Sequence, residues 1–316
     1  GIRDCRVTGV QTCALPISAH QPQREARAQQ RRALFLAGIL ASIAYGGWPA
    51  FAEFGPGFIT SSAWNIGQEQ YGGLVAIVGT LASAVLALLI GVPLSLGIAV
   101  YLTQLCPGWA RKPVSMTIEL LASVPSIIYG MWGLFIFAPL FAHYVQMPVS
   151  SVVEGMPIVG TLFYARVPSG VGILTAGIIL AIMIVPFVAS ITRDMLDQIP
   201  TVLRESAYGI GCTTWEVVRH VLVPQASVSI IGAIMLGLGR ALGETMAVTF
   251  VIGNANRLSG SVFDPGSTIA SRIANEFNEA DGLQLSSLMA LGCLLFIITF
   301  FVLIIARLLV RRAKVA

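Results

Sequence analysis

The chain has 316 residues, of which 56% are hydrophobic and only 11% are charged, and its mean hydropathy is +0.82. A soluble domain of this size is far less apolar, so the composition excludes a soluble globular protein and indicates an integral membrane protein. The net charge of +4 does not indicate nucleic-acid binding, because the basic residues lie in short clusters beside apolar runs.

Residues 1–18 contain no initiator methionine, no hydrophobic periodicity and no signal-peptide layout. They resemble translated sequencing-adapter read-through, and we exclude them from the fold prediction as a processing scar would be excluded. A genuine disordered tail is the alternative interpretation. Residues 19–32 form a polar, basic N-terminal segment that contains four arginines.

Six apolar runs follow, and each is long enough to cross the hydrocarbon core as a helix. They lie at about 33–52, 73–102, 117–142, 171–192, 226–252 and 285–309. The sequence therefore predicts an all-α membrane protein with one domain of six transmembrane helices over residues 33–312. Internal prolines are expected to kink or break several of these helices, either as ordinary kinks or to line a pathway: Pro93, Pro125, Pro139 and Pro186.

Arginine and lysine are distributed unequally between the two sides of the predicted membrane. One side carries the segment 19–32, the loops 103–116 and 193–225 and the basic C-terminus, whereas the other side has only Arg166, Arg257 and Arg272. The positive-inside rule therefore predicts that both termini and these two loops are cytoplasmic. The outer loops are acidic, which suits either a soluble extracytoplasmic partner or plain solvation.

The loop 193–225 is polar and helix-forming although it lies between two apolar runs. Its pattern predicts two short helices joined by a turn, because glycine favours a positive φ at a helix end and a capping box favours a helix start. The residues that give these signals are Pro200, Gly209, Gly211, Thr213 and Glu216, with Pro224 expected to stop or bend the second helix.

A motif in this loop resembles the EAA loop of the membrane subunits of ABC importers, E-A-A-x-x-x-G followed after nine residues by I-x-L-P. The matching residues are Glu205, Ser206, Ala207, Gly211 and Pro224. The resemblance implies that the loop docks on a cytoplasmic ATPase and couples it to transport, with Glu205, Ala207 and Gly211 at the contact. A loop that packs only against its own bundle is the alternative.

Longer segments at 54–65, 119–133 and 239–248 resemble the PstC family of membrane subunits of bacterial phosphate ABC importers, and the resemblance extends over residues 33–312. It implies a type I ABC-importer permease fold in the bacterial inner membrane and phosphate as the substrate. It also implies three partners: a second membrane subunit like PstA, a dimeric ATPase like PstB and an extracytoplasmic phosphate-binding protein like PstS. A permease for sulfate or molybdate is one alternative, and a self-sufficient channel or secondary transporter is another.

No catalytic centre, cofactor or metal site is predicted. The sequence has no G-x-x-x-x-G-K-[ST] phosphate loop, no G-x-S-x-G elbow and no H-E-x-x-H pair, and its three histidines are scattered. The chain is therefore expected to be a transport subunit rather than an enzyme. If transport uses ATP, another polypeptide must hydrolyse it.

The run 226–252 contains two ionisable residues, Arg240 and Glu244, which are predicted to share one face of a single helix. A charge at the bilayer centre costs about 2.5–3.5 kcal/mol on insertion scales, so both side chains must face a partner, a cavity or the bundle interior. Either they simply neutralise each other, or Arg240 meets the transported anion while Glu244 holds the arginine. The resemblance to the PstC family favours the second interpretation.

Overall fold

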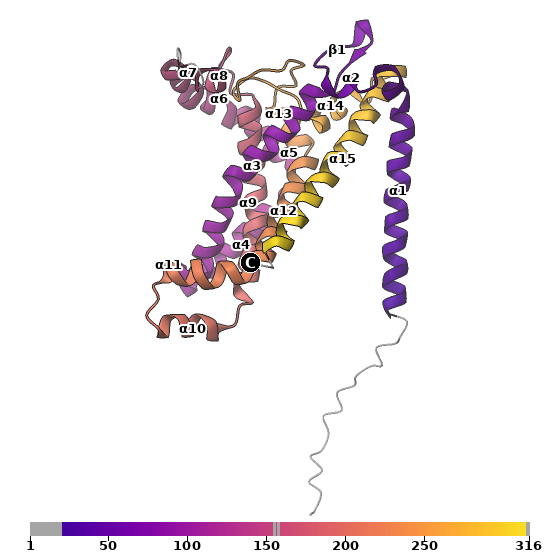
Figure 1. Ribbon diagram of the computed structural model, residues 1–316. Coiled ribbons are helices and arrows are strands. Elements are labelled where there is room, and N and C mark those ends of the chain that lie inside the picture. Colours follow the sequence, from indigo (N-terminus) through magenta and orange to yellow (C-terminus); the bar gives the residue numbers. More distant parts are fainter. Residues whose placement is uncertain (1–20, 154–155, 157–158, 314–316) are drawn as a thin grey trace, which may run out of the picture.

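The computed structural model describes residues 21–153, 156 and 159–313 (Figure 1). The stretch 1–18, interpreted above as read-through, lies outside the described residues. Within them, six helices are long and apolar enough to cross a membrane, which confirms the predicted number of spans. These spans are Leu34–Phe54, Leu74–Leu105, Ser126–Val153, Ile173–Asp197, Thr214–Gly243 and Gly282–Ile305.

The chain is almost entirely helical. Its long helices are α1 (Gln21–Phe54), α3 (Leu74–Val100), α4 (Gly108–Ser123), α9 (Ile173–Asp197), α12 (Val223–Gly243) and α15 (Gly282–Ala313). The shorter helices are α2 (Gly57–Thr60), α5 (Ser126–Trp132), α6 (Ala138–Phe141), α7 (Met147–Val153), α8 (Val159–Phe163), α10 (Thr201–Gly209), α11 (Thr214–Glu216), α13 (Met246–Val251) and α14 (Ile269–Glu276). The two strands, β1 (Trp64–Asn65) and β2 (Gln70–Tyr71), form an antiparallel hairpin.

The core lies where α9 packs between α3 and α12. Small residues allow this close packing: a Cβ on Gly177 of α9 would lie 2.8 Å from the Cβ of Leu86 on α3, and one on Gly237 of α12 would lie 2.8 Å from Val188. Helix α13 closes the same apolar cluster. Because lipid tails are as apolar as leucine, such close backbone approach is what favours helix association in a membrane.

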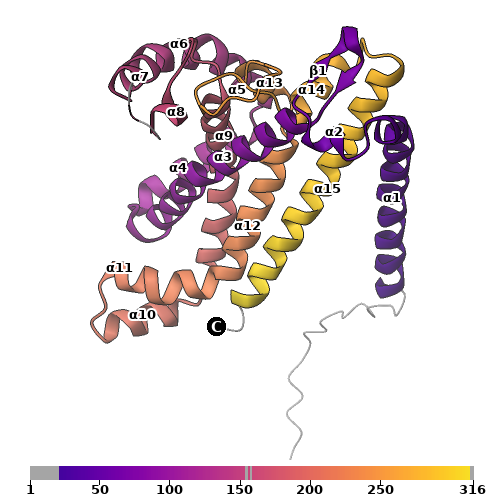
Figure 2. The ribbon, with the colours of Figure 1, turned by 45° about the horizontal axis from the view of Figure 1, so that its top comes forward.

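Helix α1 lies at the edge of the molecule and packs mainly along α15 (Figures 1 and 2). The two helices approach closely at Gly47, where a Cβ would lie 2.8 Å from the backbone nitrogen of Ala290. The other faces of α1 are exposed, with Phe35, Tyr45 and Trp48 among its most open side chains. An apolar helix with one neighbour is stable here only because the bilayer solvates its remaining surface.

The prolines affect their helices in different ways. Pro93 and Pro186 lie inside continuous helices, so neither proline breaks its span. Pro139 begins α6 directly after a π-helical segment, whose wider turn accommodates the missing N–H. Pro125 does separate two helices, so the predicted span 117–142 was wrong: α4 ends at Ser123, and the spanning helix begins at Ser126.

The two ends of the molecule differ in character (Figure 1). One end carries the start of α1, the end of α15 and the helices α10 and α11. The opposite end carries the β1–β2 hairpin together with α2, α7, α8 and α14. This arrangement is what six crossings require, since an even number of spans returns the chain to the side on which it started.

Candidate functional site

The helix that carries Arg240 ends three residues later. Glu244 is extended, with φ −73° and ψ 125°, and α13 begins at Met246 after Thr245. The expectation of one continuous helix over 226–252, with Arg240 and Glu244 on one face, was therefore wrong. Gly243 is a poor helix-interior residue and favours a helix end, and Glu244 after it is extended.

Glu244 has a local partner instead of Arg240. Its Oε1 accepts a hydrogen bond of 3.4 Å from the backbone N–H of Ala247, so the carboxylate caps the first turn of α13. No ion pair joins Arg240 to Glu244 in the part of the chain that the structure describes. The simpler of the two interpretations, that Arg240 and Glu244 neutralise each other's charge, thus has no geometric support.

Arg240 is half-buried, and its Nε is buried with no hydrogen-bond partner in the described part of the chain. A guanidinium is a planar fork of donors that suits the oxygens of a tetrahedral anion, and a donor with no protein partner remains available for one.

A second helix break lies beside the first. Val124 and Pro125 are extended between α4 and α5, and the Tyr129 hydroxyl spans the break by donating 2.9 Å to the carbonyl of Leu121. Helix α5 packs directly on α13, because a Cβ on Gly130 would lie 2.8 Å from the Cα of Ala247. Discontinuous helices placed side by side within a membrane protein are typical of substrate pathways.

The surface of α12 next to Arg240 is open. Gly232, Gly239 and Gly243 have nothing within 4 Å of a built Cβ, and Leu236, on the same stripe, is 58% exposed. Leu236 and the glycines recur at helical spacing, so the open stripe runs along one face toward the break. A face that combines small residues with a half-buried charge is poorly suited to lipid and well suited to another protein or to water.

The predicted coupling loop forms the helical hairpin of α10 and α11 at the opposite end of the bundle from the β1–β2 hairpin (Figure 1). Pro200 lies one residue before the first helical position, and α10 ends at Gly209. Gly211 has φ +92°, which confirms the expected positive φ. The backbone N–H groups of Gly211 and Cys212 bond the carbonyls of Tyr208 and Ala207 and close the turn.

The motif residues in this loop divide into exposed and buried groups. Glu205, Ser206 and Gly211 are exposed, whereas Ala207 is 6% exposed and packs against the end of α9 and the start of the next span. Its methyl therefore supports the hairpin from inside instead of reaching an outer contact. Sequence reasoning missed Val202 and Ile210, which are apolar and exposed here; their apolar character in a polar loop was the available signal.

The second helix of the loop begins as predicted but does not end where predicted. Thr213 and Glu216 form the capping box, with 2.7 Å from the Thr213 N–H to Glu216 Oε2. Pro224 was expected to stop or bend this helix; it does not stop it, and α11 and α12 meet at an angle, as the alternative of a bend predicts (Figures 1 and 2). A π-helical segment over Val217–Leu222 precedes the proline, which then occupies the first turn of α12 and needs no N–H partner there.

At the other end, a polar network holds the β1–β2 hairpin. Arg272 of α14 is 4% exposed and bonds Glu276 and Asn256. Burial lowers the pKa of Arg272, and the Glu276 carboxylate opposes that shift. Burial is also the main reason that the pKa of Tyr71 is raised, with Glu69 and Glu276 adding to it. Sequence reasoning treated these outer residues only as loop charges.

Among the described residues, no group of three or more histidine, cysteine, aspartate or glutamate side chains is arranged to hold a metal ion. The structural features that remain are the paired helix breaks with Arg240 and the exposed hairpin of α10 and α11.

A family model described as "Binding-protein-dependent transport system inner membrane component" matches residues 91–315, more than half of the chain. The chain is 53% identical over 281 residues to "Phosphate transport system permease protein PstC" of Haemophilus influenzae, covering 89% of each chain. It is 54% identical to the protein of the same name from Mesorhizobium japonicum, covering 88% of this chain and 85% of the relative. "Phosphate transport system permease protein PstC 1" of Mycobacterium tuberculosis is 37% identical, covering 81% and 82%.

Two solved structures have the same fold at low sequence identity. A bacterial alginate ABC transporter in complex with a pentasaccharide-bound periplasmic protein superposes with a TM-score of 0.58, at 16% identity, covering 93% of this chain and 98% of that chain. The methionine ABC transporter MetNI in an inward-facing conformation gives a TM-score of 0.52, at 20% identity, covering 77% and 94%. These likenesses concern the arrangement of helices.

Proposed function

Because this chain belongs to the binding-protein-dependent transport system inner membrane components, and within them to the PstC permeases, we propose that it forms half of the translocation pathway of an ATP-driven phosphate importer. It is a multi-pass protein of the inner membrane with a type I ABC-importer permease fold. The observation that carries phosphate as the substrate is the sequence identity to phosphate permeases along nearly the whole chain.

The pathway is proposed to run along the open stripe of α12, past Arg240 and Glu244. A half-buried guanidinium without a carboxylate partner has to be compensated at this depth, and a transient phosphate anion compensates it during transport. Glu244 already caps α13, so its negative charge stays near the site and opposes tight trapping of the anion. In this proposal, Arg240 attracts the phosphate anion, and Glu244 shortens the time that the anion stays bound.

A second membrane subunit like PstA is proposed to cover this stripe. The exposed glycines of α12 allow a partner helix to approach closely, and the partner excludes lipid from the half-buried charges. Two such subunits enclose a pathway between them, which a single bundle with an open face does not. The open face is therefore also the reason that a self-sufficient channel has less support than an importer subunit.

The hairpin of α10 and α11 is proposed to be cytoplasmic and to dock on a dimeric ATPase like PstB. Glu205, Ser206 and Gly211 supply the exposed motif surface, and Val202 and Ile210 supply apolar contact area. Ala207 and Pro224 then act from inside, as packing and helix-start residues. The ATPase partner hydrolyses ATP, and this chain transmits its movement.

The opposite end is proposed to receive an extracytoplasmic phosphate-binding protein like PstS. This end consists of the β1–β2 hairpin with α2, α7, α8 and α14, and the buried network of Arg272 keeps the hairpin in a fixed position. A rigid seat lets a binding protein deliver its anion above the same entrance each time.

Uptake by the reconstituted complex tests this function. Proteoliposomes that contain this chain and the three partners should accumulate labelled phosphate when ATP is inside and the binding protein is outside. Excess unlabelled phosphate should abolish the signal, whereas equal excesses of sulfate or molybdate should leave it unchanged. Competition by sulfate or molybdate would instead assign the permease to that oxyanion, and ATP-independent uptake by this chain alone would make it a channel or secondary transporter.

A further inference from the structure

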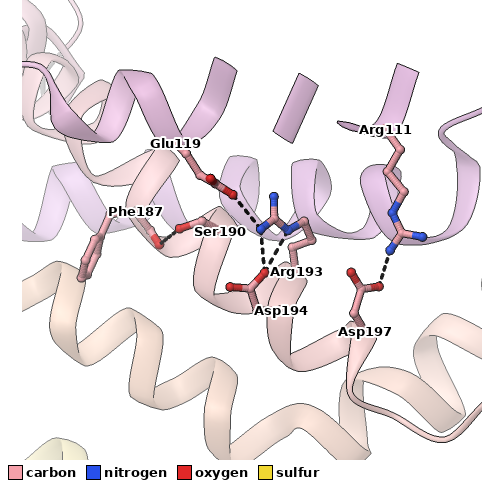
Figure 3. A network of polar contacts seen from close by, with 7 residues as sticks. All are labelled: Arg111, Glu119, Phe187, Ser190, Arg193, Asp194 and Asp197. Atoms are coloured by element: carbon pink, nitrogen blue, oxygen red, sulfur yellow. Dashed lines mark hydrogen bonds and ion pairs between the residues drawn. The ribbon is translucent and has the colours of Figure 1, made fainter. Parts of the chain in front are cut away.

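A cluster of ion pairs joins α4 to the last turns of α9 (Figure 3). The guanidinium of Arg193 lies between two carboxylates, 2.9 Å from Glu119 Oε1 and 2.6 Å from Asp194 Oδ1. Farther along the same helices, Arg111 pairs with Asp197. Arg111 and Glu119 are eight positions apart on α4, so the pairs hold α4 at two points about two turns apart.

These ion pairs matter for the position of α4, because this helix has few other contacts with the bundle that could fix it. None of its residues is buried, so it makes no deep apolar contact with the bundle. Exposed ion pairs contribute little to stability when apolar packing already fixes two elements, but they can decide position where such packing is missing. Arg193 is also the least hydrated member of the cluster, with 12% of its side chain exposed.

The end of α9 is connected in turn to the coupling hairpin. Asp197 is the last residue of α9, and the guanidinium of Arg204 on α10 donates to the carbonyl of Leu196. Leu196 and Ala207 lie in the same buried cluster. A displacement of α10 therefore moves the last turn of α9, where Arg193 and Asp197 are located.

The other end of α4 reaches the helix break. The carbonyl of Leu121, two residues before α4 ends, accepts the hydrogen bond from Tyr129 of α5. Helix α5 packs on α13, which begins directly after the helix break that follows Arg240. Helix α4 thus lies between the coupling hairpin and the anion pathway, attached to one by ion pairs and to the other by this hydrogen bond.

We infer that Arg193 and Asp197 are positioning residues that tie α4 to the end of α9, so that movement of the coupling hairpin reaches the helix break beside Arg240. This inference rests on the proposed function. The geometry also makes the tie reversible: when Glu119 moves away, Arg193 keeps Asp194, its neighbour on the same helix, and the Glu119 side chain, which is 56% exposed, is solvated by water. Such a contact can open and close in each transport cycle.

The test measures phosphate imported per ATP hydrolysed by the complete importer in proteoliposomes. Glu119→Gln and Asp197→Asn should each lower this ratio about two- to fivefold, the range that an exposed ion pair supports. The charge swap Arg111→Asp with Asp197→Arg should restore it. Lys112→Gln removes a charge from the same helix that is in no ion pair of the described part of the chain, and it should leave the ratio unchanged.

A distance measurement separates this inference from the proposed function. Spin labels at Trp109→Cys on α4 and Thr201→Cys at the start of α10, both exposed positions, with native cysteines replaced by serine, should give one narrow distance in the parent complex. Glu119→Gln combined with Asp197→Asn should broaden it. Unchanged distances and an unchanged transport ratio, or a swap that assembles but does not restore the ratio, would overturn the inference. A parent complex without phosphate uptake would instead overturn the proposed function. The distance measurement would still show whether the ion pairs hold α4 to the end of α9.

Discussion

The guanidinium carbon of Arg272 lies 4.5 Å from the ring centre of Trp64, and both side chains bond the same carboxylate, that of Glu276. The Trp64 Nε1–H donates 2.9 Å to Oε2, while Arg272 pairs with Oε1 at 3.3 Å. One strand residue of the outer hairpin is thereby fixed to α14 by a cation–π contact and a shared acceptor.

Arg272→Met should therefore destabilise the outer end by about 2 kcal/mol. The substitution removes the cation–π contact and one partner of Glu276, although Trp64 and Gln284 still bond that carboxylate. The measurement is the thermal unfolding midpoint of the purified protein, with Trp64 fluorescence reporting on the hairpin. Arg257→Met, at an exposed arginine in the same outer region, is the matched control and should leave the midpoint unchanged.

Gly130→Ala should force the two helix breaks apart. The added Cβ would lie 2.8 Å from the Cα of Ala247, and backbone cannot move aside as a flexible side chain can. We expect a loss of about 1–3 kcal/mol in stability and a clear loss of phosphate uptake. Gly97→Ala in α3 has open space and should be neutral or slightly stabilising. Equal uptake by both variants would show that the α5–α13 contact is not needed.

Gly211→Ala should weaken coupling while Gly209→Ala does not. Gly211 has φ +92°, which a side chain disfavours by about 1–2 kcal/mol, whereas Gly209 is helical and open. Gly211→Asp adds a charge to the same exposed turn and should detach or uncouple the ATPase while the protein stays in the membrane. Copurification of the ATPase and the rate of transport-coupled ATP hydrolysis measure this. An intact, fully active Gly211→Asp complex would exclude the hairpin as the coupling element.

The double variant Arg240→Met, Glu244→Leu should insert and assemble normally but take up almost no phosphate. A purely structural charge pair tolerates replacement by apolar residues of similar volume, whereas a pathway pair does not. Because Glu244 caps α13 and makes no ion pair with Arg240, Glu244→Gln alone should retain more uptake than Arg240→Met alone. Leu236→Met on the same open stripe is the control for side-chain volume. Near-normal uptake by the double variant would contradict the assigned role of Arg240.

Much of the fold was predictable from the sequence, because a membrane span requires a long apolar run that a single sequence shows. The positive φ at Gly211 and the Thr213–Glu216 capping box were predictable too, since both depend on residues that are near one another in the chain. The break at Glu244 was not, because hydropathy averaged over a window does not register a single extended residue between two apolar helices. Gly243 favours the end of α12, and the bond from Ala247 to Glu244 then caps α13, so the break depends on local residues that hydropathy does not report.

The contacts between residues far apart in the chain could not be predicted from the sequence for a different reason. Glu119 and Arg193 are 74 positions apart, and Trp64 and Glu276 are 212 positions apart. A single sequence gives the charge of each side chain but not which helix faces which. The open stripe beside Arg240 likewise depends on how α12 is rotated against α9, which small-residue packing determines.

The close packing of α1 on α15 has a consequence for how the chain is made. Of the six spans in the described part of the chain, Leu34–Phe54 leaves the ribosome before the others, and its main neighbour, Gly282–Ile305, leaves it after them. The first helix must therefore wait in the bilayer, solvated by lipid, while every other span is inserted and packed. Ribosomes that stop before Gly282 would release a chain whose central helices can already meet, but whose first helix lacks its main protein neighbour. Completion of the last helix is thus the event that closes the bundle.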